Sequence, residues 1–371
     1  MTNNDQTSRP FWKQALRALA WDLLLVAVLA SASELSLRFL IPSVQSLVYT
    51  KDKTGGHPVV LNSAKLRDEE VSPDFPADGV RIILLGNSVT FGSGIAVEDA
   101  FAGRLDALLK LRHDGVKYDV INGGGQGDAM QYYFSLLDDH GFGFNPDAVA
   151  LILTSNHVAG QKLPVAVGQA KNKDQLISSI KRIPFEAHLF LFGNFYTYVA
   201  FDRLIRQSLF AAGLTRESLN RTDNYLYGFA VDVPAVKLEK VDADYDELAR
   251  SILELKRRLE SRGIKFLIIA IPNRFELSNL RRDNHRNVPL DKIRILPGRR
   301  FKRIAEQNGI PFMDMLPVFK AKRREMLDGK ISYDPLYVTF DSIHLNPTGH
   351  RLVAESLEQM LIANGIVPRK K

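Results

Sequence analysis

The strongest constraint on the fold is an alternation of short apolar runs with longer segments of helical periodicity. The apolar runs are Arg81–Leu85, Tyr118–Ile121, Ala148–Leu153, Lys265–Ile271 and Pro311–Met313. The helical segments begin near Phe101, cover Asp128–His140, Asp244–Glu260 and Arg299–Gln307, and finish with a helix from Pro347. Strands buried on both faces are continuously apolar, and connecting helices cover the faces of a parallel sheet. The pattern therefore predicts an α/β fold with a parallel, doubly wound sheet and active-site residues at the carboxyl ends of its strands.

The composition excludes several classes of protein. With 45% hydrophobic and 25% charged residues, the 371-residue chain is typical of a globular protein and unlike a disordered chain or a multi-pass membrane bundle. Its formal charge of +7 is small beside 49 basic and 42 acidic residues, and no nucleic-acid motif accompanies it, so we expect no nucleic-acid partner. The absence of cysteine excludes disulfides, thiolate metal sites and a cysteine nucleophile, and leaves the redox compartment open.

The N-terminal region is strongly apolar over Phe11–Pro42, with its densest run at Leu23–Ala32. Asp22 and Glu34 bracket a core of eleven residues, so a span of about 20 residues must include flanking positions. A retained membrane anchor, a cleaved signal peptide and a buried soluble helix all fit this pattern. We favour the anchor because apolar residues resume after the possible cleavage motif at 30–32, as in one long helix ended by a proline.

The chain divides into four parts by composition. Residues 1–42 form the tail and membrane helix, 43–79 a linker, 80–365 the main domain and 366–371 a basic tail. Residues 160–241 interrupt the strand–helix rhythm as an aromatic, apolar insertion, for which a helical cap packed on the core is favoured over a helix resting on the membrane surface. Positive charges on the two sides of the N-terminal helix are nearly balanced, and we expect a single-pass membrane protein with its main domain on the extracytoplasmic (periplasmic) side.

A serine lies where the first predicted strand meets a glycine-flanked turn, in Gly86-Asn87-Ser88-Val89-Thr90-Phe91-Gly92. Glycine permits a tight turn that exposes the hydroxyl, and amide groups of such a turn can face an oxyanion. Alone, a serine between glycines is more often an ordinary turn. Its significance depends on a second segment near the C-terminus.

That second segment is Asp341-Ser342-Ile343-His344, just before Asn346-Pro347, which cap and start the last predicted helix. The three-residue spacing can place a carboxylate and an imidazole on the same side of a loop. His344 would then accept the proton of Ser88, while Asp341 fixes the imidazole tautomer and stabilises the imidazolium. An Asp and a His at a helix start are more often capping and surface groups, but the pairing with Ser88 reverses this preference.

Two further segments follow apolar runs: Asn122-Gly123-Gly124-Gly125-Gln126-Gly127-Asp128 and Thr154-Ser155-Asn156-His157. The backbone N–H of Gly127 and the amide of Asn156 would join the N–H of Ser88 as donors to a developing alkoxide, each worth about 3 kcal/mol in the transition state. The glycine cluster contains neither a dinucleotide fingerprint nor a Walker lysine. Because the histidines show no ligand spacing, we expect neither a metal nor a cofactor.

These four blocks, in this order, resemble those of the SGNH/GDSL hydrolases, a family named for a serine, a glycine, an asparagine and a histidine. The resemblance covers roughly residues 81–160 and 242–362. It implies Ser88 as nucleophile, Asp341 and His344 as acid and base, and Ser88, Gly127 and Asn156 as the oxyanion hole. It also implies a flavodoxin-like three-layer α/β/α sandwich with a five-stranded parallel sheet.

Two positions depart from the family pattern. Asn87 replaces the aspartate of Gly-Asp-Ser, and His157 replaces the aspartate of the Gly-x-Asn-Asp block, which reads Thr154-Ser155-Asn156-His157 here. We expect Asn87 to change local hydrogen bonds without abolishing attack, because the triad is intact. The N-terminal segment resembles that of membrane-tethered members among bacterial surface-polysaccharide proteins.

The resemblance implies a serine esterase that removes O-acyl groups, expected to be acetyl, from a carbohydrate or similar ester through an acyl-serine intermediate. One alternative is an O-acyltransferase that modifies a cell-surface polysaccharide, with a membrane acyltransferase as a candidate partner. The other is a catalytically silent glycan-binding or assembly protein, which the departures at Asn87 and His157 favour.

Overall fold

The structure is a computed structural model. It describes residues 11–40, 52–125, 130–159, 238–277, 296–327, 335–338 and 343–369, with short pieces between 191 and 205. Two residues that the sequence assigns to the site, Gly127 and Asp341, lie outside the described residues.

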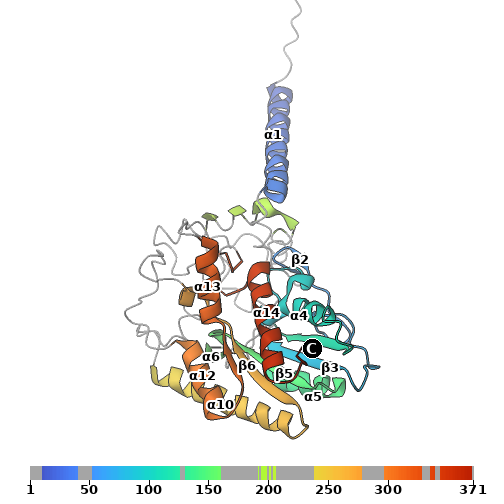
Figure 1. The fold of residues 1–371 in the computed structure, drawn as a ribbon. Helices are drawn as coiled ribbons and strands as arrows, with labels where there is room; N and C mark the ends of the chain where they lie inside the picture. Colours follow the sequence, from blue (N-terminus) through green and yellow to red (C-terminus); the bar gives the residue numbers. More distant parts are fainter. Residues whose placement is uncertain are drawn as a thin grey trace, which may run out of the picture.

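A five-stranded parallel sheet forms the centre of the molecule, in the order β4-β3-β5-β6-β7 (Figure 1). Its strands are β3 (Val80–Gly86), β4 (Tyr118–Gly124), β5 (Ala148–Leu153), β6 (Lys265–Ala270) and β7 (Phe312–Asp314). All neighbouring strands are parallel. The first strand of the sheet in sequence, β3, lies between the second, β4, and the third, β5, which is the flavodoxin-like order. The predicted parallel α/β sheet is confirmed.

The side chains of β3 divide the core into two layers. Ile82 and Leu84 share one core with α4 (Phe101–Lys110), α13 (Leu316–Leu327) and α14 (Pro347–Ala363). Ile83 and Leu85 share the other with α5 (Met130–Asp139), α10 (Leu238–Glu260) and α12 (Pro297–Gln307). These four strand residues are at most 1% exposed, as expected for a strand covered by helices on both faces.

Shorter elements complete the described fold. They are β1 (Lys53–Thr54), β2 (His57–Pro58), α3 (Ser88–Phe91), η1 (Val97–Asp99), η2 (Gly141–Phe144), α6 (Asn156–Ala159) and α11 (Arg274–Leu277). The second strand differs from its prediction, because β4 continues past Ile121 to Gly124. Its polar and glycine residues have weak strand preference, but the ladder with β3 pairs Gly124 with Gly86 and extends the strand.

Part of the segment predicted as a linker packs on the domain. Residues 53–58 form the antiparallel pair β1–β2, and Leu66 and Arg67 are each only 1% exposed. Arg81 also holds this segment, because its guanidinium donates to the carbonyl oxygen of Ser72 at 2.8 Å. Residues from 52 onward therefore contribute to the main domain.

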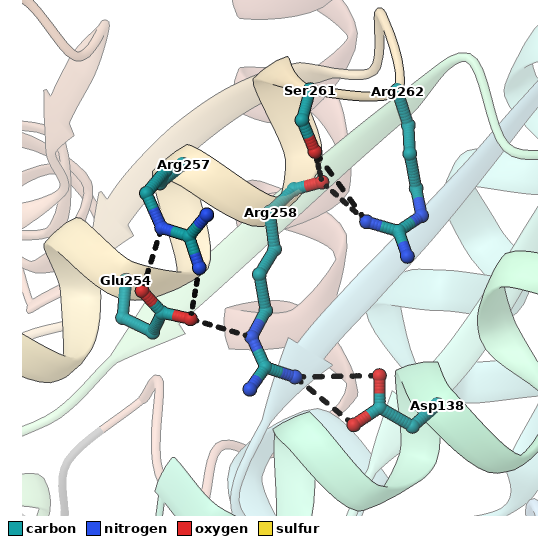
Figure 2. Close-up of polar contacts among 6 residues, drawn as sticks. All are labelled: Asp138, Glu254, Arg257, Arg258, Ser261 and Arg262. Carbon is teal, nitrogen blue, oxygen red and sulfur yellow. Dashed lines mark hydrogen bonds and ion pairs between the residues drawn. The ribbon is translucent and has the colours of Figure 1, made fainter.

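An exposed ion-pair network joins the end of α10 to α5 (Figure 2). Arg258 donates to Glu254 on its own helix at 2.8 Å and to Asp138 of α5 at 3.0 Å. Arg257 donates two further hydrogen bonds to Glu254, at 2.8 and 2.9 Å. The aliphatic and guanidinium groups also cover apolar surface, since Arg262 lies 4.0 Å above the ring centroid of Phe142.

The N-terminal helix α1 (Phe11–Leu40) projects away from the domain (Figure 1). Its stretch Leu19–Leu37 has a mean hydropathy of 1.6 and is 0% buried. It is long and apolar enough to cross a membrane, a property that membrane anchors and signal sequences share.

Candidate active site

The turn after β3 presents Ser88 at the carboxyl end of the sheet. Asn87 caps α3, its side-chain oxygen accepting the backbone N–H of Val89 at 3.0 Å. Gly86 is required by a close approach, because a Cβ there would lie 2.0 Å from the hydroxyl oxygen of Thr90. Gly92 ends the turn in the left-handed conformation, with φ of 80°. The result is a sharp strand-to-helix turn that leaves Ser88 half-buried between buried neighbours.

His344 meets Ser88 across 256 residues of sequence. Its Nε2 lies 2.8 Å from the Ser88 Oγ, the distance of a hydrogen bond in which the hydroxyl donates to the ring nitrogen. Backbone bonds hold the histidine in place, since the N–H of Val338 donates to the His344 carbonyl at 2.9 Å and Tyr337 bridges to Leu345. The structure thus brings together the predicted nucleophile and base.

The capping of α14 fixes the same loop from its other side. Asn346 accepts the N–H groups of Thr348 and Gly349 at 2.9 and 3.0 Å, and its Nδ2 donates to the carbonyl of Pro335 at 2.9 Å. The predicted helix start is therefore confirmed, and it ties His344 to the 335–338 segment. Asp341, the predicted partner of the imidazole, lies outside the described residues, and its role stays a prediction.

The predicted oxyanion donors Gly127 and Asn156 follow, in sequence, the two strands that flank β3, β4 and β5. Asn156 starts α6 directly after β5, and its side-chain oxygen is buried with no hydrogen-bond partner among the described residues. On the other flank, the N–H of Gly125 donates to the Gly86 carbonyl at 2.9 Å, which joins the end of β4 to the end of β3. Gly127 follows two residues later, outside the described residues, so its contribution stays a prediction.

A buried polar network next to the serine turn contains Asn87 and His157, the two residues that depart from the family pattern. Asn87 donates from Nδ2 to the hydroxyl of Thr154 at 2.8 Å, and the backbone N–H of Thr154 donates to Nδ1 of His157 at 3.1 Å. The other ring nitrogen of His157, Nε2, lies 2.8 Å from the Tyr133 hydroxyl. Asn87, His157 and Tyr133 are 0% exposed. Asn87, Thr154, His157 and Tyr133 are hereafter called the buried network.

The buried network connects the two strand ends that carry the candidate catalytic groups. Asn87 immediately precedes Ser88, and His157 immediately follows Asn156. The side chains of Asn87 and His157 are thus fixed by buried hydrogen bonds. A carboxylate at either position would need compensation for its lost hydration. Tyr133 could not be identified from the sequence, because it lies on α5, 24 residues from the histidine that it contacts.

Arg67 is a second residue that sequence reasoning missed. Its guanidinium donates to the carbonyl oxygens of Gly92 at 2.7 Å and Ile95 at 2.9 Å, and lies 5.4 Å from the ring centroid of Phe91. These bonds attach the 52–67 segment to the loop that ends the serine turn. Arg67 is 1% exposed, and this burial lowers the pKa of its guanidinium from its usual value. No local sequence signal distinguishes this arginine from the surface arginines.

His350, six residues after His344, is buried and packs against α4. Its Nδ1 accepts the backbone N–H of Phe101 at 3.0 Å, and the two rings stack with centroids 5.3 Å apart. Burial, with the nearby charge of His344 as a further cause, lowers the pKa of His350 to about 3. The ring therefore stays neutral at physiological pH and is unsuited to act as the base. Among the described residues, no group of three or more His, Cys, Asp or Glu could hold a metal ion.

Comparisons with known proteins find structural likeness only. No family model and no curated protein matches the chain. A gut microbial diltiazem-metabolizing enzyme is 16% identical, with a TM-score of 0.45; the match covers 78% of this chain and 49% of that one, so this chain spans about half its length.

Two further solved proteins have similar sequence identities and TM-scores. A catalytic mutant of an acetylxylan esterase from Geobacillus stearothermophilus is 16% identical, with a TM-score of 0.40 and coverage of 76% and 94%. A candidate lipolytic protein of the G-D-S-L family from Desulfitobacterium hafniense DCB-2 is 12% identical, with a TM-score of 0.39 and coverage of 76% and 100%. With TM-scores below 0.5, the function of this chain has to be inferred from its own site.

Proposed function

We propose that the chain is a membrane-anchored serine ester hydrolase of the SGNH/GDSL type. The observation that carries the proposal is the 2.8 Å contact between Ser88 Oγ and His344 Nε2 at the carboxyl ends of a parallel sheet. A hydroxyl beside an imidazole is the pair that nucleophilic acyl transfer requires, because the base takes the proton as the oxygen attacks. The sequence blocks that resemble the family support the same assignment.

In the proposed mechanism, Ser88 Oγ attacks the ester carbonyl while its proton passes to Nε2 of His344. The tetrahedral oxyanion is stabilised by the N–H of Ser88, the amide of Asn156 and the N–H of Gly127. Collapse breaks the bond to the leaving oxygen, which takes the proton from His344 and departs as an alcohol. Water, deprotonated by His344, then attacks the acyl-serine, and the carboxylic acid leaves as the proton returns to Ser88.

Asp341 would accept the other ring N–H of His344 and stabilise the imidazolium. The departure at Asn87 is compatible with this chemistry, because its side chain caps α3 and donates to the Thr154 hydroxyl. This placement argues against the catalytically silent interpretation, for which Asn87 and His157 were the reasons. Both residues instead belong to the buried network.

We propose an O-acylated carbohydrate as the substrate. We also propose that α1 anchors the chain in the membrane and that the domain lies on the extracytoplasmic side. Stretch Leu19–Leu37 supplies the apolar length of a span. Acyl transfer to a surface glycan uses the same acyl-serine and differs only in the acceptor, a sugar hydroxyl in place of water. A membrane acyltransferase would then be a partner that supplies the acyl group.

Hydrolysis of a small aryl acetate by the detergent-solubilised full chain tests the proposal. We expect turnover by the natural chain and loss of at least about 10³-fold in Ser88→Ala. Equal rates in the two proteins would overturn the mechanism. Mass spectrometry of an acetylated glycan incubated with the enzyme then separates the two acceptors, because hydrolysis removes acyl groups and transfer adds them when a donor is present.

A further inference from the structure

We propose that the described pieces of residues 194–205, called here the foot segment, rest in the membrane–water interface beside α1. In this position they hold the active-site edge of the domain towards the lipid surface. The inference goes beyond the proposed hydrolysis and rests on one part of the proposed function, the anchoring by α1. Three observations carry it.

The first observation is a polar contact between the foot segment and α1. Glu34 lies near the C-terminal end of the apolar stretch Leu19–Leu37, where an uncompensated carboxylate is costly in lipid. One of its carboxylate oxygens accepts the backbone N–H of Tyr196 at 3.0 Å, and the other accepts that of Thr197 at 2.8 Å. The Thr197 hydroxyl also lies 3.4 Å from that of Ser33. The foot segment thus compensates the acidic group at the end of the span.

The second observation is the exposure of apolar side chains in the foot segment. Phe195 is 42% exposed, Phe201 60% and Leu204 59%. Phe201 and Leu204 are each in a helical conformation. A cap packed on the core would bury such residues, whereas aromatic and apolar side chains next to a spanning helix are typical of the interfacial layer.

The third observation is the direction of the sheet. In Figure 1, β6 starts beside the end of α10 and runs towards the end of the molecule that carries α1, with the foot segment between them. All five strands are parallel, so Ser88 and the His344 that contacts it lie at the same edge of the sheet as the end of β6. A foot segment in the interface therefore keeps the reactive groups close to the bilayer, where a membrane-associated acyl ester or acceptor is presented.

The chain contains no cysteine, which permits a direct test by site-directed spin labelling. The variants Phe201→Cys and Leu204→Cys of the full chain are labelled with a nitroxide in vesicles of phosphatidylcholine and phosphatidylglycerol. Collision rates with oxygen, which concentrates in lipid, and with a water-soluble nickel chelate are then measured. Val26→Cys in α1 serves as the lipid reference, and Leu111→Cys, at a side chain 65% exposed after α4, as the water reference.

We expect the labels at 201 and 204 to show oxygen-to-nickel ratios several-fold above that at 111. Replacing Glu34 by Ala should lower these ratios, while Asp22→Ala, which removes the other acidic residue of the span, should leave them unchanged. Ratios at 201 and 204 equal to that at 111, with a lipid value at 26, would overturn the inference alone. A water value at 26 would overturn the anchor as well, and in either case aryl acetate hydrolysis reports separately on the chemistry.

Discussion

Two polar networks in this molecule differ in both burial and charge. The buried network under Ser88 contains no Asp, Glu, Lys or Arg and is almost entirely removed from water, whereas the network of Figure 2 joins charged side chains on the surface of α10 and α5. Arg257, for example, remains 70% exposed while it contacts Glu254. Hydrogen bonds that cannot exchange with water fix side-chain positions, while exposed ion pairs are screened and contribute little.

The difference indicates which groups the fold holds in place for chemistry. The buried network links the strand ends that carry Ser88 and Asn156, and the exposed one only fastens a helix end. Changes at the site should therefore have large effects on rate, changes in the buried network should affect stability, and changes in the exposed network should have almost none.

The largest effect is expected at His344. His344→Ala removes the base that accepts the Ser88 proton, and we expect kcat to fall by about 10⁴-fold with KM little changed. Steady-state kinetics on an aryl acetate measure both parameters. His350→Gln is the comparison variant, since its ring contacts a backbone N–H and not the serine, and it should keep most of the activity of the folded enzyme. Similar losses in both variants would contradict the assignment of the base.

Asn156→Ala is expected to have the second-largest effect on the rate. Loss of one oxyanion donor costs about 10²–10³-fold in kcat, because the donor acts on the charge that develops in the transition state and not on the ground state. The expected signature is a reduced kcat at nearly constant KM. A variant that instead raised KM alone would place Asn156 in substrate binding and remove it from the oxyanion hole.

Glu276, a buried carboxyl group following β6, should make stability depend on pH. Burial raises its pKa to about 7, although the backbone N–H of Asn273 donates to it at 2.9 Å. The folded chain keeps the proton up to about pH 7, whereas the unfolded chain releases it near its ordinary value of 4.5. The stabilising contribution is therefore complete below pH 4.5 and is lost as the pH rises through 7.

Glu276→Gln removes this titration and keeps the shape of the side chain. At about 1.4 kcal/mol for each unit of pKa, the variant should gain up to about 3 kcal/mol relative to the natural chain between pH 4.5 and pH 8. Urea unfolding at the two pH values measures the difference. A constant difference between the two proteins across this range would show that the carboxyl group titrates normally.

Tyr133→Phe tests the buried network. The change removes the hydroxyl that contacts the buried Nε2 of His157, and we expect a loss of about 1–3 kcal/mol in the free energy of unfolding. Tyr132→Phe, on the same helix, removes an equivalent hydroxyl outside the buried network and provides the control. Equal stabilities of the two variants would mean that the contact to His157 is not stabilising.

Arg257→Ala should have the smallest effect. Its side chain donates to Glu254 on the exposed face of the same helix, so the thermal midpoint should stay unchanged within error at physiological salt. A clear drop in the midpoint that persisted at high salt would show that the exposed network is as important as the buried one.

The sequence predicts most of the sheet, because its strands are apolar on both faces and alternate with amphipathic helices. It also predicts Ser88 and His344, since each follows from a local motif at a strand end or helix start. It does not predict Tyr133 or Arg67, whose roles come from contacts with residues brought near by the fold. Neither side chain has a neighbour in sequence that marks it, and only the packing of distant segments determines its partner.

The insertion shows the same limitation in another form. A packed cap and a membrane-surface helix have the same aromatic composition, and the sequence favoured the cap. The exposure of Phe201 and Leu204 and the bonds to Glu34 favour the surface position for the described pieces. Such a distinction depends on which face is covered, which composition does not specify.

Labelling of the full chain with a fluorophosphonate tests the central claim most directly. Such a reagent phosphonylates a serine only when a base activates it, and peptide mass spectrometry identifies the modified residue. We expect one adduct on Ser88, none in Ser88→Ala, and a greatly slowed reaction in His344→Ala. An unmodified Ser88 in the natural chain, or labelling as fast in His344→Ala as in the natural chain, would contradict the proposed pairing of hydroxyl and imidazole.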